Sequence, residues 1–196
     1  GACLLLGTKK LKLWRTGTAG RPADTPGGLK DFIWANNNAR DPEVRTEFGR
    51  FRIGPGDLLL IPRGVRFSVD PLGGASRRGW WIEAFGSGFE LPNRGVVGAN
   101  GLAEPRHFVA CEAEYEDAEG EWTIIQKYGG SFYAAETTHS PFDVVAWHGN
   151  YAPYKYDLRT YSPVGAIAFD HPDPSIFTVL TSPSETAGTA NIDFVI

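Results

Sequence analysis

Short apolar runs separated by glycine- and proline-containing turns recur along the whole chain, which has 196 residues with 24 Gly and 14 Pro. No helical periodicity persists for more than about two turns. β-branched and aromatic residues favour strands, whereas Gly and Pro favour the turns between them. A chain of this length can bury a substantial core. The sequence therefore predicts an all-β fold with long, irregular Gly- and Pro-rich connections.

One segment predicts a particular pair of strands. Residues 56–67 read GDLLLIPRGVRF, with the spacing G-x5-P-x-G. This pattern predicts a buried strand over 58–61, a turn at 62–64 and an antiparallel partner strand over 65–69. The spacing is similar to the second conserved box of the cupin family, except that Phe67 stands where a metal-binding cupin places histidine. Because Phe cannot ligate a metal, we expect a cupin-like, jelly-roll barrel or sandwich whose metal position is lost here.

Several other strands are expected, and two of them end in polar clusters that contain histidine. The apolar runs 143–147 and 164–169 lead into the polar groups around His148 and His171, a pattern typical of strands that deliver side chains to a rim. Residues 11–13 predict an edge strand whose lysines face solvent, and 79–85 a strand with an exposed Glu83. Residues 122–127 and 131–135 predict a hairpin. The other predicted strands are 29–35, 50–53, 176–181 and 192–196.

Composition excludes some classes of function. The formal charge of −4 argues against broad polyanion binding. The six Lys and Arg among residues 1–30 are most simply a solvated strand face, with contact to nucleic acid or membrane as the alternative, and we expect neither as a partner. No apolar run approaches the roughly 20 residues of a membrane span. Cys3 and Cys111 are far apart and form no CxxC motif, which favours a reduced, cytoplasmic protein. Residues 112–121 contain six acids and predict an exposed acidic loop, with a cation site as the alternative.

Five long strings together carry a family resemblance. They are TEFGRFRIGPGDLLLIPRGVRFSVD, FELPNRGVVGANGLAEPRHF, WTIIQKYGGSFYAA, AWHGNYAPYKY and AFDHPDPSIFTVLTSPS. The chain from residue 46 to residue 196 resembles the homogentisate 1,2-dioxygenase family over these strings, whereas residues 1–45 match poorly. We therefore expect a poorly matching segment 1–45 followed by a family-like β domain over 46–196.

The resemblance implies a function and one catalytic residue. Family enzymes use Fe(II) and dioxygen to open the ring of homogentisate to maleylacetoacetate, and they assemble as oligomers, so a homo-oligomer is expected. His171 in AFDHPDPSIF matches the family histidine that acts as acid and base near the substrate hydroxyl. Imidazole suits that role because its ordinary pKa is about 6.5. From the residues alone, a turn histidine in a proline-bracketed loop is the alternative.

The other histidines and the nearby tyrosines predict structural roles. His148 is expected to hydrogen-bond loop backbone, His107 to be dispensable, and His139 to lie in a polar turn. The residues expected to act as packing and loop anchors are Tyr151, Tyr154, Lys155 and Tyr156.

An iron oxygenase needs two histidines and a carboxylate around its metal. In the family resembled, the first histidine and the glutamate are separated by five residues. The residues at that position after the four histidines here are Ala113, Val145, Tyr154 and Phe177. We therefore expect no metal ligands and no bound iron in this chain, a chain that stops before the family's iron site, and no activity of the chain alone. The alternative functions are a non-catalytic cupin-like scaffold and a small-ligand-binding protein.

Overall fold

The computed structural model describes residues 12–16, 29–36, 43–70, 79–85, 87–93, 103–143, 152–162 and 178–195. Across these ranges the regular elements are strands and two short 3-10 helices, which confirms the all-β prediction. The strands are β1 (Lys12–Thr16), β2 (Leu29–Asn36), β3 (Glu43–Thr46), β4 (Gly49–Arg52), β5 (Asp57–Pro62), β6 (Arg66–Asp70), β7 (Gly79–Phe85), β8 (Phe108–Val109), β9 (Glu119–Tyr128), β10 (Ser131–His139), β11 (Tyr154–Asp157), β12 (Thr178–Pro183) and β13 (Ala190–Val195). The helices are η2 (Pro105–His107) and η3 (Leu158–Thr160).

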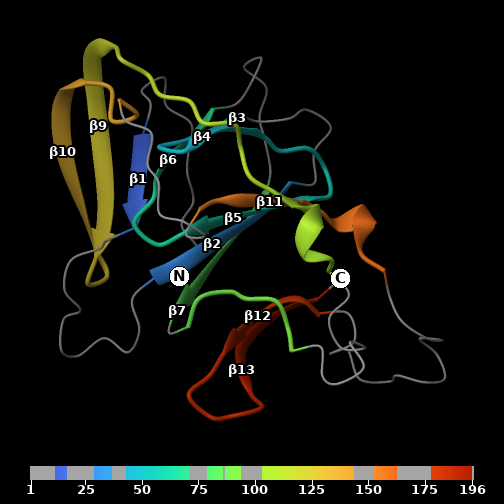
Figure 1. Ribbon diagram of the computed structural model, residues 1–196. Coiled ribbons are helices and arrows are strands. Elements are labelled where there is room, and N and C mark those ends of the chain that lie inside the picture. Colours follow the sequence, from blue (N-terminus) through green and yellow to red (C-terminus); the bar gives the residue numbers. More distant parts are fainter. Residues whose placement is uncertain are drawn as a thin grey trace.

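The strands form three sheets (Figure 1). A six-stranded sheet has the order β10-β9-β1-β6-β3-β4, and a five-stranded sheet has the order β7-β2-β5-β11-β8. Strands β12 and β13 form a separate antiparallel pair. Each sheet ends in edge strands among the described residues, so the cupin-like arrangement is a layered sandwich of open sheets.

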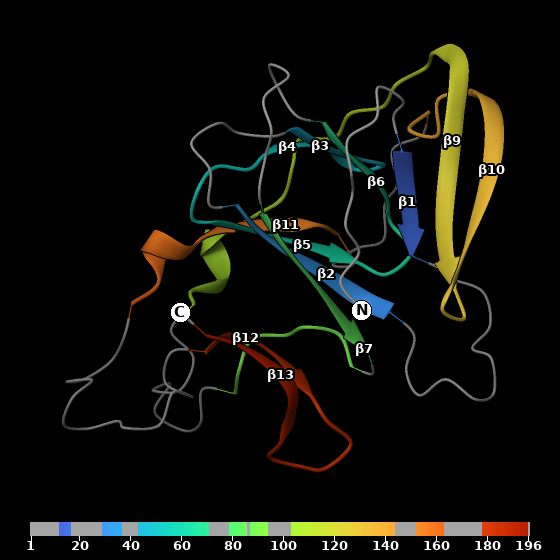
Figure 2. The same ribbon diagram turned by 180° about the vertical axis from the view of Figure 1, so that it is seen from behind.

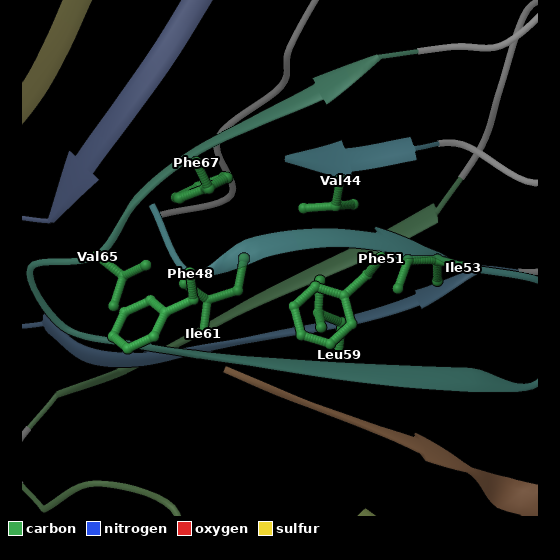
Figure 3. Close-up of a cluster of buried hydrophobic side chains, with 8 residues drawn as sticks. All are labelled: Val44, Phe48, Phe51, Ile53, Leu59, Ile61, Val65 and Phe67. Atoms are coloured by element: carbon green, nitrogen blue, oxygen red, sulfur yellow. The ribbon is translucent and has the colours of Figure 1, made fainter. Parts of the chain in front are cut away.

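The first core cluster lies between the two larger sheets. Its members are Val44, Phe48, Phe51, Ile53, Leu59, Ile61, Val65 and Phe67, and all are at most 8% exposed. Figure 3 shows side chains from β3, β4 and β6 meeting those of β5. This apolar layer joins the two sheets, since burial of such side chains is the main favourable term in folding.

A second core cluster covers the opposite face of β5. It consists of Leu58, Ala84, Phe89, Ala103, Tyr156, Val179 and Leu180, and it joins the five-stranded sheet to β12 (Figure 2). Successive residues of a strand point to opposite faces, so Leu58 enters this cluster while Leu59 enters the first. The run Leu-Leu-Leu-Ile is apolar throughout because both faces of β5 are covered.

The predicted pairing of the two strands in GDLLLIPRGVRF is wrong. Strand β5 pairs with β2 and β11 in one sheet, whereas β6 pairs with β1 and β3 in the other. The turn after Pro62 therefore carries the chain across the sandwich. Ile61 and Val65 meet within the first core cluster and are not partners in a backbone ladder.

The predicted edge strand near the N-terminus is also wrong. Strand β1 lies inside the six-stranded sheet, antiparallel to β6 and parallel to β9. Alternating lysines indicate which face of a strand is wet, but they do not reveal how many backbone neighbours the strand has. Among the described strands, the edge on this side of the sheet is β10.

The hairpin predicted from WTIIQKYGGSFYAA is confirmed and is longer than expected. Strands β9 and β10 pair antiparallel from Tyr128↔Ser131 onward. The turn residues Gly129 and Gly130 both have positive φ, 56° and 80°. That conformation matches the right-handed twist of the flanking strands and favours Gly at both positions.

An ion pair ties the hairpin to the other sheet. The Lys127 ammonium lies 2.7 and 3.0 Å from the two carboxylate oxygens of Glu83 on β7. The Glu83 side chain is only 9% exposed, so the expectation of an exposed acid there is wrong. Its partner is 44 residues away in sequence, which is why composition near residue 83 did not indicate it.

Candidate functional site

The acidic segment forms a strap across β3 and β4. We call residues 112–118 the acidic strap. The Arg45 guanidinium donates to both carboxylate oxygens of Glu116, at 2.7 and 2.8 Å, and Arg50 lies 2.9 Å from Glu114. The Ser140 hydroxyl also donates to Glu116, at 2.8 Å. The prediction of an exposed acidic loop is therefore only partly right, because Glu116 is half-buried and two arginines hold the strap.

Gly49 allows the strap to approach β4 closely. A β bridge joins Gly49 to Ala113. A Cβ atom at Gly49 would lie 2.0 Å from the Glu112 carbonyl oxygen and 3.0 Å from the Cys111 sulfur. The backbone also has φ +141°, a conformation that L side chains rarely adopt. The absence of a side chain is thus a requirement of this contact.

Cys111 directly precedes the acidic strap and is a free thiol packed against the first core cluster. Burial raises the pKa of the thiol, while hydrogen bonds with its own backbone and with Thr46 oppose the rise. A thiol with a raised pKa is mostly protonated at neutral pH and reacts slowly. Cys111 therefore fits a packing role better than nucleophilic chemistry.

Arg45 and Phe142 form a further contact next to the acidic strap. The guanidinium carbon lies 5.8 Å from the centre of the Phe142 ring, within the range of a cation–π contact. Trp122 meets the same ring edge-on, with centroids 6.4 Å apart. Arg45, Arg50, Glu114, Glu116 and Phe142 line one small pocket. Each arginine there is paired with a carboxylate, so these contacts are best explained as structural ones that hold the acidic strap against β3 and β4.

His139 connects the strap to the chain that follows β10. One ring nitrogen, Nε2, lies 2.9 Å from Asp117, and the other, Nδ1, lies 3.2 Å from the Ser140 carbonyl oxygen and 3.5 Å from Asp143. The hydrogen bond with Asp117 raises the pKa of His139, as does the Ser140 carbonyl. The prediction that His139 lies in a polar turn is wrong, because His139 is the last residue of β10 and the turn follows at 141–142. The contacts of His139 stabilise the fold most when the imidazole is protonated.

Replacing Asp117 with asparagine should lower the pKa of His139 toward its ordinary value, because the carboxylate that favours the imidazolium is lost. The folded pKa is raised above the unfolded one. The contribution of His139 to stability is therefore fully present below the unfolded pKa and is lost as pH rises through the folded pKa. An NMR titration of the His139 ring protons measures this shift. Glu185→Gln, a change in the exposed β12–β13 loop, is the control, and an equal pKa in both variants would contradict the role of Asp117.

His171, the predicted catalytic residue, lies outside the described residues, as do His148 and Tyr151. The structure does describe the chain on both sides of 163–177. Leu158 and Tyr161 before it, and Val179 and Leu180 after it, all pack in the second core cluster. The described residues on both sides of 163–177 therefore contact the same apolar layer.

Two tyrosines near that segment keep their protons. Burial raises the pKa of Tyr161 to about 12, and it also raises the pKa of Tyr156. Tyr156 is fully buried and stacks on Phe108, with ring centroids 4.5 Å apart. The packing role predicted for Tyr156 is confirmed, and both phenol groups are neutral at physiological pH.

The other predicted anchors surround β11. The Lys155 ammonium donates to the Arg52 carbonyl oxygen at 3.2 Å and lies 3.5 Å from Asp57. Tyr154 is half-buried opposite Leu60 in the ladder between β11 and β5. His107 is exposed on η2. The anchoring roles of Tyr154 and Lys155 agree with these positions.

The described residues do not fit an iron site. No group of three or more His, Cys, Asp and Glu side chains suited to a metal occurs among them. His139 has two carboxylates nearby, but at the end of β10 it is hydrogen-bonded to Asp117 and lies 3.5 Å from Asp143. A non-heme iron site needs ligands on one face with open positions for substrate and oxygen.

None of the described helices is long and apolar enough to cross a membrane.

Sequence reasoning missed the contacts that hold the strap. Arg45 and Glu116 are separated by 71 residues, and Asp117 and His139 by 22 residues. No local motif marks either pair. Only the charge of residues 112–121, read together with the arginines of 45–52, could have suggested that the strap was docked.

Comparison with known proteins points to one family. The sequence model described as Homogentisate 1,2-dioxygenase N-terminal matches residues 32–158, and the one described as Homogentisate 1,2-dioxygenase C-terminal matches residues 159–196. The homogentisate 1,2-dioxygenase of Rhodopseudomonas palustris strain BisB18 is 62% identical over 151 residues, which is 77% of this chain and 34% of the relative. That of Bradyrhizobium diazoefficiens is 62% identical over 165 residues, or 84% and 36%. The chain spans about a third of the length of the curated relatives it matches.

Proposed function

Because this chain belongs to the homogentisate 1,2-dioxygenase family, we propose that the protein opens the ring of homogentisate oxidatively to maleylacetoacetate, in the breakdown of tyrosine and phenylalanine. The observation that carries this proposal is the family match, which runs without a break from residue 32 to residue 196. Homogentisate and dioxygen are the proposed substrates. A cytoplasmic location goes with the proposal, and the free Cys111 thiol supports it.

The domain division that accompanies this proposal assigns residues 46–196 to the family's β domain. Residues 1–45 then form an N-terminal segment that contributes β1, β2 and the first three residues of β3 to the two large sheets. Assembly of several copies also belongs to the proposal.

We propose His171 as the group that moves a proton at the substrate hydroxyl. A histidine can both accept and donate a proton near neutral pH. The attachment of the flanking chain to the second core cluster supports this role, because a catalytic group must be held in position. The raised pKa of Tyr161, about 12, keeps the phenol that precedes this segment neutral.

The proposed activity requires Fe(II), the cofactor of the family, which would activate dioxygen. We infer that residues 1–196 by themselves hold no ferrous ion tightly and do not turn over. No histidine in the sequence has an acid six positions later, and the described residues do not fit an iron site. Stoichiometric iron in the purified 196-residue chain, together with ring cleavage, would contradict this inference.

Oxygen uptake by the iron-loaded natural gene product in the presence of homogentisate tests the proposed activity. His171→Gln should lower kcat by about 10²–10⁴-fold while the iron content stays the same, because general acid–base catalysis contributes that much. His107→Gln, on the exposed η2 helix, is the matched control and should leave kcat unchanged. Failure of the unaltered protein to consume oxygen would favour a non-catalytic cupin-like scaffold or a ligand-binding protein.

A further inference from the structure

His139 ends β10 where the acidic strap meets the chain that follows this strand. The strap leads from the region of β3 and β4 to the start of β9 (Figure 1). The Ser140 amide donates to the Ala118 carbonyl oxygen at 2.8 Å, and the Glu116 amide donates to the Phe142 carbonyl oxygen at 2.7 Å. Ser140 and Phe142 are each 1% exposed. These two backbone hydrogen bonds therefore hold the strap against a buried part of the chain after β10.

Both ring nitrogens of His139 face oxygen atoms that accept hydrogen bonds. Nε2 lies 2.9 Å from a carboxylate oxygen of Asp117. Nδ1 lies 3.2 Å from the Ser140 carbonyl oxygen and 3.5 Å from a carboxylate oxygen of Asp143. A neutral imidazole has one N–H group, whereas an imidazolium has two. Only the protonated ring can therefore donate on both sides, and a neutral ring leaves one nitrogen lone pair facing an acceptor oxygen.

The charges around the ring favour the same protonated state. Asp117 and Asp143 approach different ring nitrogens, and both carboxylates raise the pKa of His139. Loss of the ring proton removes the cation between them. Guanidinium groups stay charged across the physiological pH range, so the contact of Arg45 with Glu116 does not depend on His139. The charged side chains on the elements next to His139 are Glu116 on the strap, Glu119 opposite it in the β9–β10 ladder, Arg45 on β3 and Arg66 on β6, which donates to the Pro141 carbonyl oxygen.

We propose that His139 is a pH-sensitive latch on the acidic strap: the imidazolium fastens residues 116–118 to the chain after β10, and loss of its proton lets this contact open more often. The pKa of His139 is raised in the folded chain. The latch is therefore fully closed below the ordinary value of about 6.5 and weakens as pH rises through the folded value. The latch belongs to the fold and does not depend on the proposed enzymatic activity.

Solvent exposure limits the size of the effect. The side chain of His139 is 37% exposed and that of Asp117 is 79% exposed. Water and salt screen an ion pair of this kind, so its influence on a local opening equilibrium is modest. We expect the open fraction of the contact between the strap and the chain after β10 to rise about threefold when His139 loses its proton.

Amide hydrogen exchange of the 196-residue chain, followed by NMR from about pH 5.5 to about pH 8.5, tests the latch. Each exchange rate is divided by the rate of an unstructured amide at the same pH, which gives a protection factor. The protection factors of the Glu116 and Ser140 amides should fall about threefold over this range. The Thr181 amide, which donates to the Glu90 carbonyl oxygen at 2.9 Å away from the strap, is the internal control and should keep its protection.

Two variants should remove the pH dependence in opposite ways. His139→Gln carries no charge at any pH, so the Ser140 amide should show the low protection of the unaltered chain at high pH throughout. Asp117→Asn should keep the strap fastened at high pH, because the new amide can donate to Nε2 of a neutral ring while Nδ1–H donates to the Ser140 carbonyl oxygen. His107→Gln, on the exposed η2 helix, is the matched control and should leave the threefold fall unchanged.

Constant protection of the Glu116 and Ser140 amides in the unaltered chain would overturn the proposal. So would a threefold fall that persists in His139→Gln, because another group would then be responsible. Circular dichroism should show the same fold in all variants. The pH profile of the unaltered chain requires no substitution, so it decides the question even where a variant does not fold.

Discussion

Replacing Phe67 with alanine should lower the free energy of unfolding by about 3–5 kcal/mol, the range for removing a large aromatic from a packed core. Phe67 is 0% exposed and lies among Val44, Leu59 and the other members of the first core cluster (Figure 3). The cavity would open between the two large sheets. Urea unfolding followed by fluorescence measures the change.

Tyr115→Ala is the matched control for this prediction. Tyr115 is also a large aromatic residue, but it is 61% exposed on the acidic strap. Its removal should change the free energy of unfolding by no more than about 0.5 kcal/mol. Equal effects of the two changes would show that the first core cluster is not the centre of stability.

Phe67→His tests the interpretation of the lost metal position in the cupin-like box. The imidazole would enter a largely apolar cluster, so it should destabilise the fold, and one histidine there should create no metal site. Its neighbours Val44, Phe51 and Leu59 supply no N, O or S side-chain donors. Binding of one Co²⁺ or Ni²⁺ per chain by this variant would contradict the interpretation.

Gly49→Ala should lower the free energy of unfolding by about 3 kcal/mol or more, because backbone strain and a backbone clash act together. The new Cβ atom would lie 2.0 Å from the Glu112 carbonyl oxygen, so the strap must move. That movement would uncover Cys111, and the variant thiol should react faster with a disulfide reagent than the unaltered one. Urea unfolding and the rate of thiol labelling are the two measurements.

Gly130→Ala separates the clash from the strain. Gly130 also has positive φ, +80°, but a Cβ atom there would meet nothing within 4 Å. Gly130→Ala should lower the free energy of unfolding by about 1–2 kcal/mol, the amount expected for a left-handed conformation alone. The rate of Cys111 labelling should not change. If Gly49→Ala were no more destabilising than Gly130→Ala, the close contact of the strap with β4 would be refuted.

Local signals explain the predictions that were confirmed. The Gly129-Gly130 turn between two alternating runs indicated the β9–β10 hairpin, since a turn and its flanking strands are adjacent in sequence. The apolar run 58–61 indicated a buried strand, and β5 is buried on both faces. The family resemblance of residues 46–196 was likewise present in the order of residues alone, and the family match agrees with it.

The sequence by itself determined that this chain is all-β, where most of its strands lie and to which family it belongs. Tertiary structure alone decided that β5 and β6 are in different sheets, that β1 is inside a sheet and β10 at its edge, and that Arg45 and Lys127 pair with Glu116 and Glu83. The physical reason is that turn and strand preferences act over a few residues. The choice of a hydrogen-bonding or ionic partner depends instead on which apolar faces the whole chain can bury together.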